Sequence, residues 1–143
     1  MPQEQWLSKF VSVYQALNKD NLDKLGLIYH QDILFRDPIH EVNGLGDLTE
    51  YFAHLYENVL SIDFDITDAF EQGDSAFLYW RMTFAHRKLK GGKNVVVEGH
   101  SRLTQVNGLV LSHRDYLDAG EMLYENIPLV GSVVRFIKKS ASQ

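Results

Sequence analysis

The chain has 143 residues, of which 45% are hydrophobic and 12% aromatic, and its formal net charge is −5. The lack of cysteine excludes disulfides, thiolate nucleophiles and Cys-ligated zinc. The acidic balance argues against nucleic-acid binding, and no stretch approaches the ~20 apolar residues of a membrane span. The start, MPQEQWLSKF, has neither the basic nor the apolar region of a signal peptide. We expect one domain over residues 1–143, located in the cytoplasm, that buries a sizeable core.

The first third of the sequence predicts three helices. The run NKDN, residues 18–21, ends the first helix and supplies capping residues for a short second one over residues 25–29. Asp47 and Glu50 form a capping-box pattern that opens the third. The first helix, residues 3–18, is identified by apolar residues at spacings of three and four, which form one stripe: Trp6, Phe10, Val13, Tyr14 and Leu17.

A short extended piece is expected between the second and third helices. Residues 33–35, ILF, are apolar, and the Asp37–Pro38 step ends them because proline cannot donate to a strand ladder. The stretch HEVNGLG that follows contains the turn formers Asn43 and Gly44, so we expect a loop there.

From residue 62 the hydrophobic period changes to two, which indicates strands. Residues 75–88 and 94–105 predict two long strands joined by a hairpin at Gly91–Gly92. A second hairpin signal, Asn107–Gly108, leads into a strand over residues 109–118. Helices followed by a meander of long strands predict an α+β fold with helices on one face of a curved antiparallel sheet.

Side chains alternate across a strand, so each long strand offers two faces. On each strand one set of alternating residues is apolar and the other set mixes polar and apolar residues; we call these sets the apolar parity and the mixed parity. Two interpretations are open. In the first, the apolar parity faces the helices and the mixed parity faces water. In the second, helices over a pocket cover one face and a partner subunit covers the other. The mixed parity contains Phe77 and Tyr79, which are too apolar for a purely wet face. In the strand over residues 75–88 the apolar side consists of Ala76, Leu78, Trp80, Met82 and Phe84, and the mixed side consists of Phe77, Tyr79, Arg81, Thr83 and Ala85.

Two short motifs carry a resemblance to a known superfamily. They are YHQDILFRDP, residues 29–38, with Gly44 after it, and HRDYLD, residues 113–118. In this order and spacing the chain resembles the nuclear transport factor 2-like superfamily, also called SnoaL-like or ketosteroid isomerase-like. The resemblance covers nearly the whole chain and implies a cone-shaped curved antiparallel sheet with the N-terminal helices packed on its concave face. It also implies that the mixed parity lines an interior pocket.

Similarity to ketosteroid isomerases implies a site for proton transfer. Asp37 stands at the place of the general base in their acidic-Pro step, and Tyr14 lies near the place of their oxyanion-binding tyrosine. His100 occupies the place of a protonated Asp that donates the second hydrogen bond, and a histidine can also donate. In SnoaL-like polyketide cyclases a pocket Asp is the acid/base for an aldol closure, and either Asp37 or Asp115 fits that role.

Similarity to limonene epoxide hydrolase is incomplete. Asp115 and Arg81 match one acid and the arginine of its Asp–Arg–Asp triad, but Thr83 stands where the second acid would be. Phe35 and Asp37 occupy the places of the Tyr and Asn that position water. The resemblance therefore disfavours epoxide hydrolysis.

We interpret the chain as a pocket protein that acts by proton transfer on a small hydrophobic carbonyl compound, as an isomerase or cyclase, with no cofactor and no metal. Asp37 is the expected acid/base, with Asp115 and Arg81 as an orienting pair and with Tyr14 and His100 stabilising charge. The alternative is a non-catalytic small-ligand-binding or dimerisation module on the same fold, so catalysis itself is left open. The expected substrate contacts are Phe35, Phe77, Tyr79, Thr83, Glu98, His113 and Leu117.

Each of these roles has a structural alternative. Asp37 can initiate the turn before Pro38, since Asp-Pro is a common turn pair. Asp115 and Arg81 can form an ion pair without chemistry, and Tyr14 can be a core aromatic.

The assembly is expected to be a homodimer through the sheet. An apolar strand face would be left exposed in a monomer, so Leu78, Trp80 and Met82 are expected to be buried against a second subunit. After the sheet, residues 121–139 predict one or two further helices, broken near Pro128 and Gly131. This amphipathic end is expected to pack across the pocket mouth or on the neighbouring subunit.

Overall fold

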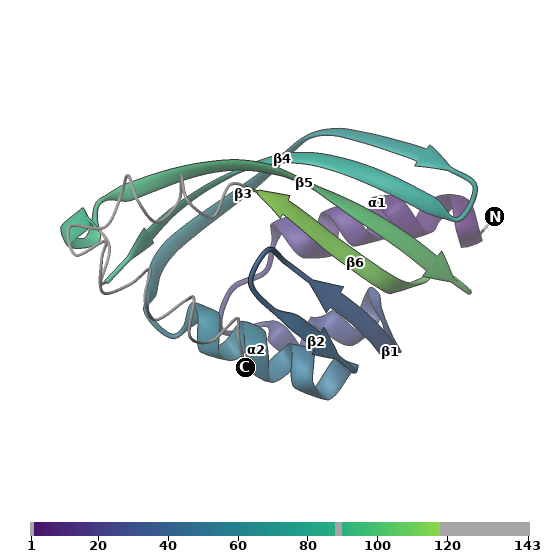
Figure 1. Cartoon of the computed structure of the whole chain (residues 1–143), viewed down its shortest axis with the longest axis horizontal. Coiled ribbons are helices and arrows are strands. Elements are labelled where there is room, and N and C mark those ends of the chain that lie inside the picture. Colours follow the sequence, from purple (N-terminus) through teal and green to yellow (C-terminus); the bar gives the residue numbers. More distant parts are fainter. Residues whose placement is uncertain (1, 88–89, 118–143) are drawn as a thin grey trace.

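Three helices and six strands make up the fold in the computed structural model, which describes residues 2–87 and 90–117 (Figure 1). The helices are α1 (Pro2–Gln15), the short 3₁₀ helix η1 (Leu22–Leu27) and α2 (Leu45–Tyr56). The strands are β1 (Tyr29–Arg36), β2 (Glu41–Asn43), β3 (Val59–Gln72), β4 (Ser75–His86), β5 (Asn94–Val106) and β6 (Leu109–Leu117). A 3₁₀ turn, η2 (Lys90–Gly92), lies between β4 and β5. The predicted α+β class and the long strand hairpins are confirmed.

The strands form one curved, open sheet in the order β2-β1-β6-β5-β4-β3 (Figure 1). All neighbours are antiparallel except β1 and β6, which run parallel. The expected antiparallel meander is confirmed for β3 to β6, and the parallel pair arises because β1 precedes α2 and adds to the last strand of that meander. A crossover of this kind suits a parallel pair, which a tight hairpin cannot join.

The stretch expected to be a loop contains strand β2. The backbone turns after Asp37, and Leu34, Phe35 and Arg36 then pair with residues 41–43. Gly44 ends the strand with a φ of 91°, and its N–H donates to the Ile33 carbonyl at 2.7 Å. Because Gly44 occupies this left-handed conformation, α2 begins at Leu45 and not at the capping-box pattern near Asp47.

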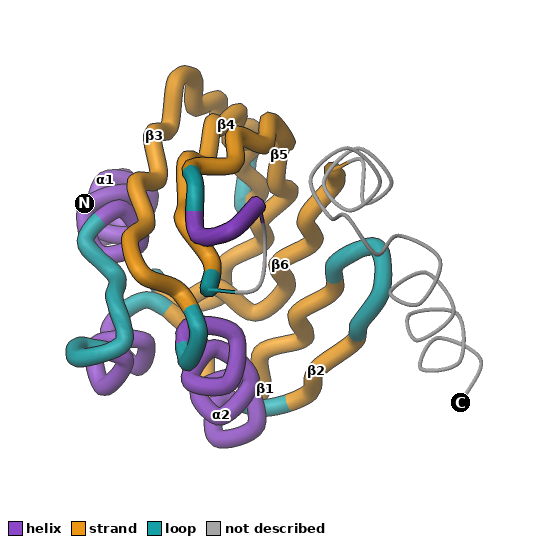
Figure 2. Tube along the Cα trace, turned by 90° about the vertical axis from the view of Figure 1, so that its left-hand side faces the viewer, coloured by secondary structure: helices purple, strands orange, loops and turns teal. Residues whose placement is uncertain are grey.

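The core lies between the inner, concave face of the sheet and the helices, and Figure 2 shows α1 and α2 on that side. α1 packs against β3, and α2 packs against β1. Leu78 and Trp80 are 1% and 4% exposed, and burying side chains of this size contributes about 1.5–3 kcal/mol each. The expectation that these two residues meet a second subunit was therefore wrong: the apolar parity faces the helices, as the simpler of the two interpretations had it.

No helix within residues 2–87 and 90–117 is long and apolar enough to cross a membrane. The helices predicted over residues 121–139 lie outside the described residues.

Candidate functional site

The inner face of β6 carries a buried histidine beside a carboxylate. His113 is 1% exposed, and its Nε2 lies 2.6 Å from Oδ1 of Asp115. Its Nδ1 lies 2.6 Å from the hydroxyl of Tyr29, at the start of β1. A carboxylate only accepts hydrogen bonds, so Nε2 carries the ring proton and its N–H donates a hydrogen bond to Oδ1 of Asp115. In a neutral ring Nδ1 then accepts the hydrogen bond of the Tyr29 hydroxyl.

Two chains of hydrogen bonds, which we call arms, end on Asp115. The first runs from Tyr29 through His113, and the second comes from the neighbouring strands. The Trp80 indole N–H donates to Oγ of Ser101 at 2.9 Å, and the Ser101 hydroxyl donates to Oδ1 of Asp115 at 2.5 Å. Gly99 makes room for the indole, because a Cβ there would lie 2.6 Å from two Trp80 ring carbons. Both arms end on the same oxygen, which leaves Oδ2 of Asp115 without a hydrogen bond to any described residue. The Asp115 side chain is 14% exposed.

Aromatic rings surround the histidine. Their centroids lie 4.8–5.9 Å from that of His113. They exclude water and strengthen the hydrogen bonds of the two arms, since electrostatic interactions gain in a medium of low dielectric. The rings belong to Phe10, Tyr14, Tyr29 and Phe35.

Four tyrosines around Asp115 have raised pKa values. Burial is the main cause in each, and the negative charge of Asp115 adds to it. The pKa of Tyr56 rises to about 12, and those of Tyr14, Tyr29 and Tyr51 rise as well. All four hydroxyls therefore stay protonated near neutral pH and serve as hydrogen-bond donors.

Two of these four hydroxyls have no hydrogen-bond partner within residues 2–87 and 90–117. They belong to Tyr14 and Tyr56, and neither is a buried unsatisfied group. The Tyr14 and Tyr56 rings pack on Phe52, with centroids 6.5 and 6.2 Å away. The inner face thus combines one carboxylate with two available hydroxyl donors.

Asp37 sits in a separate arrangement at the β1–β2 turn. Its Oδ1 accepts the backbone N–H groups of Ile39 and His40 at 2.8 and 2.6 Å. Its Oδ2 accepts the Tyr51 hydroxyl at 2.6 Å, and that hydroxyl also lies 3.2 Å from Nδ1 of His40. Both oxygens of Asp37 are occupied, which matches the turn-forming alternative.

The predicted site residues divide between the two faces of the sheet. Tyr14, Phe35, His113, Asp115 and Leu117 belong to the inner side. The expected Asp115–Arg81 pair is wrong, because Arg81 pairs with Glu98 at 2.8 Å on the outer face, where both side chains are exposed. The other residues of the mixed parity also lie on that face: Phe77, Tyr79, Thr83 and His100.

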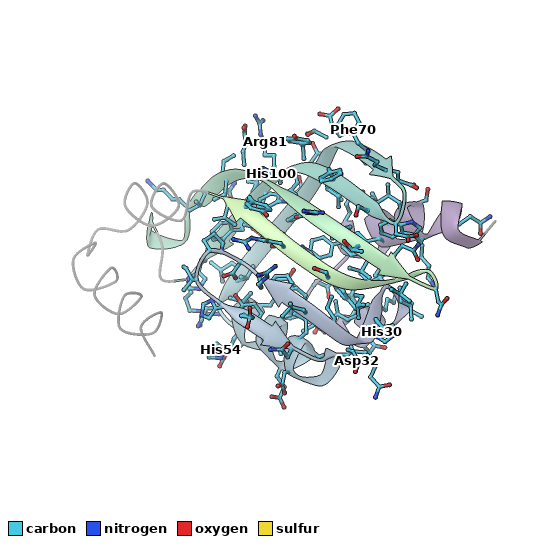
Figure 3. All side chains as sticks on the ribbon, turned by 45° about the vertical axis from the view of Figure 1, so that its right-hand side comes forward. His30, Asp32, His54, Phe70, Arg81 and His100 are labelled. Atoms are coloured by element: carbon cyan, nitrogen blue, oxygen red, sulfur yellow. The ribbon has the colours of Figure 1, made fainter. Side chains whose placement is uncertain are left out.

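The placement of Arg81 and His100 has a simple physical reason. The described helices all cover one face of the sheet. Side chains alternate along a strand, so Leu78 and Trp80 lie on that face and Arg81 lies on the other. Figure 3 shows Arg81 and His100 on the side of the sheet away from the helices. His100 stacks there between Tyr79 and Tyr116.

Sequence reasoning missed Tyr29, Ser101, Trp80, Tyr51 and Tyr56 as members of the site. One signal was present: Ser101 is the single hydroxyl within the apolar parity of β5. A buried hydroxyl needs a partner, and Asp115 provides it.

Comparison with known proteins places the chain in a family. The SnoaL-like domain family matches residues 10–113, and the chain belongs to that family. No curated protein sequence matches the chain.

Solved structures with the same fold share little sequence. A protein with a ketosteroid isomerase-like fold from Catenulispora acidiphila DSM 44928, in complex with trimethylamine, is 15% identical with a TM-score of 0.71, over 84% of this chain and 90% of that one. A candidate SnoaL-like polyketide cyclase from Shewanella putrefaciens CN-32 is 21% identical with a TM-score of 0.69, over 84% and 92%. An epoxide hydrolase of the limonene epoxide hydrolase-like type from M. tuberculosis is 14% identical with a TM-score of 0.69, over 96% of both chains. At these identities the likeness shows the fold, which is the predicted one.

Proposed function

We propose that this protein is a proton-transfer enzyme, an isomerase or cyclase, that acts on a small hydrophobic carbonyl compound with Asp115 as its acid/base. One observation supports the proposal: Oδ1 of Asp115 is held by Ser101 and His113, while Oδ2 has no hydrogen-bond partner among the described residues and the side chain is 14% exposed. A carboxylate fixed in this way is oriented toward one proton-transfer direction.

The chemistry follows from the neighbouring groups. Oδ2 of Asp115 takes a proton from the carbon beside the substrate carbonyl, and the electron pair moves onto the carbonyl oxygen. Protonated hydroxyl groups of Tyr14 and Tyr56 are the donors that stabilise the negative oxygen. In an isomerase the proton returns from Asp115 to another carbon. In a cyclase the enolate carbon attacks a second carbonyl of the same molecule, and the oxygen of that carbonyl, now an alkoxide, takes up the proton from Asp115.

Asp115 replaces Asp37 in the role of acid/base that the sequence suggested. Asp37 accepts three hydrogen bonds, two from the backbone N–H groups of its own turn and one from the Tyr51 hydroxyl. Hydrolysis of epoxides by an Asp–Arg–Asp triad is not supported, because Arg81 pairs with Glu98 on the other face of the sheet. We further propose that the protein is a homodimer that associates through its sheet.

The test does not require the natural substrate. The protein is incubated in D₂O with a panel of small hydrophobic ketones, and exchange of the protons beside the carbonyl is followed by NMR. The wild-type protein should accelerate exchange of at least one ketone, and Asp115→Asn should lose about 100-fold or more of that rate. A panel in which the wild-type protein never exceeds the buffer rate would favour the non-catalytic binding module.

A further inference from the structure

Trp80 reaches Ser101 across a space that Gly99 leaves in the sheet. On the neighbouring strands β4 and β5, Trp80 pairs with Gly99, and Ser101 lies two residues further along β5 (Figure 1). A Cβ on Gly99 would lie 2.6 Å from two carbons of the indole, so the ring can lean over this position only because it is a glycine. Trp80 and Ser101 are 4% and 2% exposed, so their hydrogen bond is shielded from bulk water.

The direction of the Ser101 hydroxyl follows from the atoms around it. An indole N–H can only donate, so the Trp80 Nε1–H occupies a lone pair of Ser101 Oγ, 2.9 Å away. The hydroxyl proton must then point elsewhere, and Oδ1 of Asp115 accepts it at 2.5 Å. Ser101 and Asp115 are direct register partners on β5 and β6, which keeps the two side chains together. Because a serine hydroxyl otherwise rotates to suit its surroundings, Trp80 supplies the fixed direction.

The other donor to Asp115 is held in the same way from the opposite end. The Tyr29 hydroxyl donates to Nδ1 of His113, which keeps the ring proton on Nε2, 2.6 Å from Oδ1 of Asp115. Oδ1 thus receives two hydrogen bonds, and each of the two donors is fixed by a further donor behind it. A proton placed on Oδ1 would meet both, whereas Oδ2 accepts no hydrogen bond from residues 2–87 and 90–117.

We propose that Trp80 is a positioning residue for proton transfer: its indole N–H turns the Ser101 hydroxyl toward Asp115 and so confines the proton taken from the substrate carbon to Oδ2. The inference rests on the proposed function and adds a residue that acts on Asp115 only through Ser101. Hydrogen bonds in a buried chain polarise one another, so a change at one end of the chain reaches the other.

The kinetics of ketone exchange on the full chain test this route. Ser101→Ala and Trp80→Phe should each lower kcat about tenfold and leave KM within about twofold, because both loosen the orientation of Asp115 and keep its carboxylate. The double variant Trp80→Phe/Ser101→Ala should be no slower than Ser101→Ala, since the indole N–H has no effect without the hydroxyl. Trp6→Phe is the matched control and should keep the wild-type kcat. Its indole is 3% exposed but makes no hydrogen bond to any described residue.

Two kinetic results would overturn the proposal. The first is a wild-type kcat in either single variant, because the substituted residue would then serve packing alone. The second is a double variant that loses the product of the two single effects, because Trp80 would then act independently of Ser101. Circular dichroism verifies that each variant is folded; should Trp80→Phe not fold, Ser101→Ala and the spectra described next decide.

A second measurement does not depend on catalysis. The chain has two tryptophans, so ¹H–¹⁵N spectra contain one indole N–H resonance from Trp6 and one from Trp80. Asp115→Asn should move the Trp80 resonance and leave that of Trp6 in place, and the same substitution should not move the Trp80 resonance when Ser101 is already alanine. Asp37→Asn, the matched control, should leave both resonances in place.

The spectra separate this inference from the proposed function. A Trp80 resonance that does not respond to Asp115→Asn, or that responds equally without the Ser101 hydroxyl, would overturn the role of Trp80 even in an active enzyme. A wild-type protein that exchanges no ketone, but whose Trp80 resonance responds as expected, would overturn the proposed function and support the chain of hydrogen bonds from Trp80 to Asp115.

Discussion

His113 and Asp115 sit two residues apart on one strand, and Nε2 of the first lies 2.6 Å from Oδ1 of the second. Strand alternation puts both side chains on the inner face, and Tyr29 anchors the far nitrogen of the imidazole. The imidazole is 1% exposed and both of its nitrogens are hydrogen-bonded, so His113 holds Asp115 in position, and its expected contact with substrate stays a prediction.

Removing the anchor of the imidazole should destabilise the protein. Tyr29→Phe leaves Nδ1 of His113 buried without a partner, which should lower the free energy of unfolding by about 1–3 kcal/mol in urea titrations. Tyr79→Phe, on the exposed outer face, should change it by less than about 0.5 kcal/mol. Equal effects of the two substitutions would contradict the buried hydrogen bond.

The contact between Gly99 and Trp80 predicts a strong effect of one added methyl group. In Gly99→Ala the Cβ would lie 2.6 Å from the indole and 2.7 Å from the Tyr116 carbonyl oxygen, so the ring must move and its N–H must leave Ser101. We expect a loss of about 1–3 kcal/mol of stability and a shift of the tryptophan fluorescence spectrum. Gly46→Ala, which meets no atom within 4 Å in α2, is the control and should be neutral or stabilising. An unchanged spectrum in Gly99→Ala would refute the close packing.

The raised pKa of Tyr56 predicts a loss of stability in alkali. The folded protein holds the phenol proton up to a pKa of about 12, whereas the unfolded chain releases it near 10. The contribution is complete below pH 10 and declines as the pH rises toward 12, because the unfolded state then binds fewer protons than the folded state. Tyr56→Phe should make this decline shallower in unfolding titrations across that range. Identical slopes for wild type and variant would show that Tyr56 is not buried near Asp115.

Local patterns predicted the fold well because they are set by neighbouring residues in the chain. The period-two pattern after residue 62 and the Asn107–Gly108 signal predicted β3 to β6 close to their observed bounds. The parallel pairing of β1 with β6 could not be predicted in this way, since it joins segments about 80 residues apart.

The site was predicted only in part. Asp115 and His113 were predicted as site residues, but the other members of their hydrogen-bond network, Ser101, Trp80 and Tyr29, were not, because they come from three other strands. The alternation of apolar and mixed residues alone predicts which side of β4 and β5 faces the core: it is the apolar side. The resemblance had suggested that the mixed side lines the interior, but in the described part of the chain the helices cover the apolar side of these strands.

The most direct test of the account compares Asp115→Asn with Asp37→Asn in the ketone exchange assay, on whichever ketone the wild-type protein exchanges. Asn keeps the size of each side chain but cannot take up the proton. Asp115→Asn should lose about 100-fold or more of the exchange rate while remaining folded, since amide groups can still bond to Ser101 and His113. Asp37→Asn should retain the rate within about threefold, even where its turn is weakened. Loss of exchange in Asp37→Asn together with its retention in Asp115→Asn would contradict the assignment of Asp115 as the acid/base.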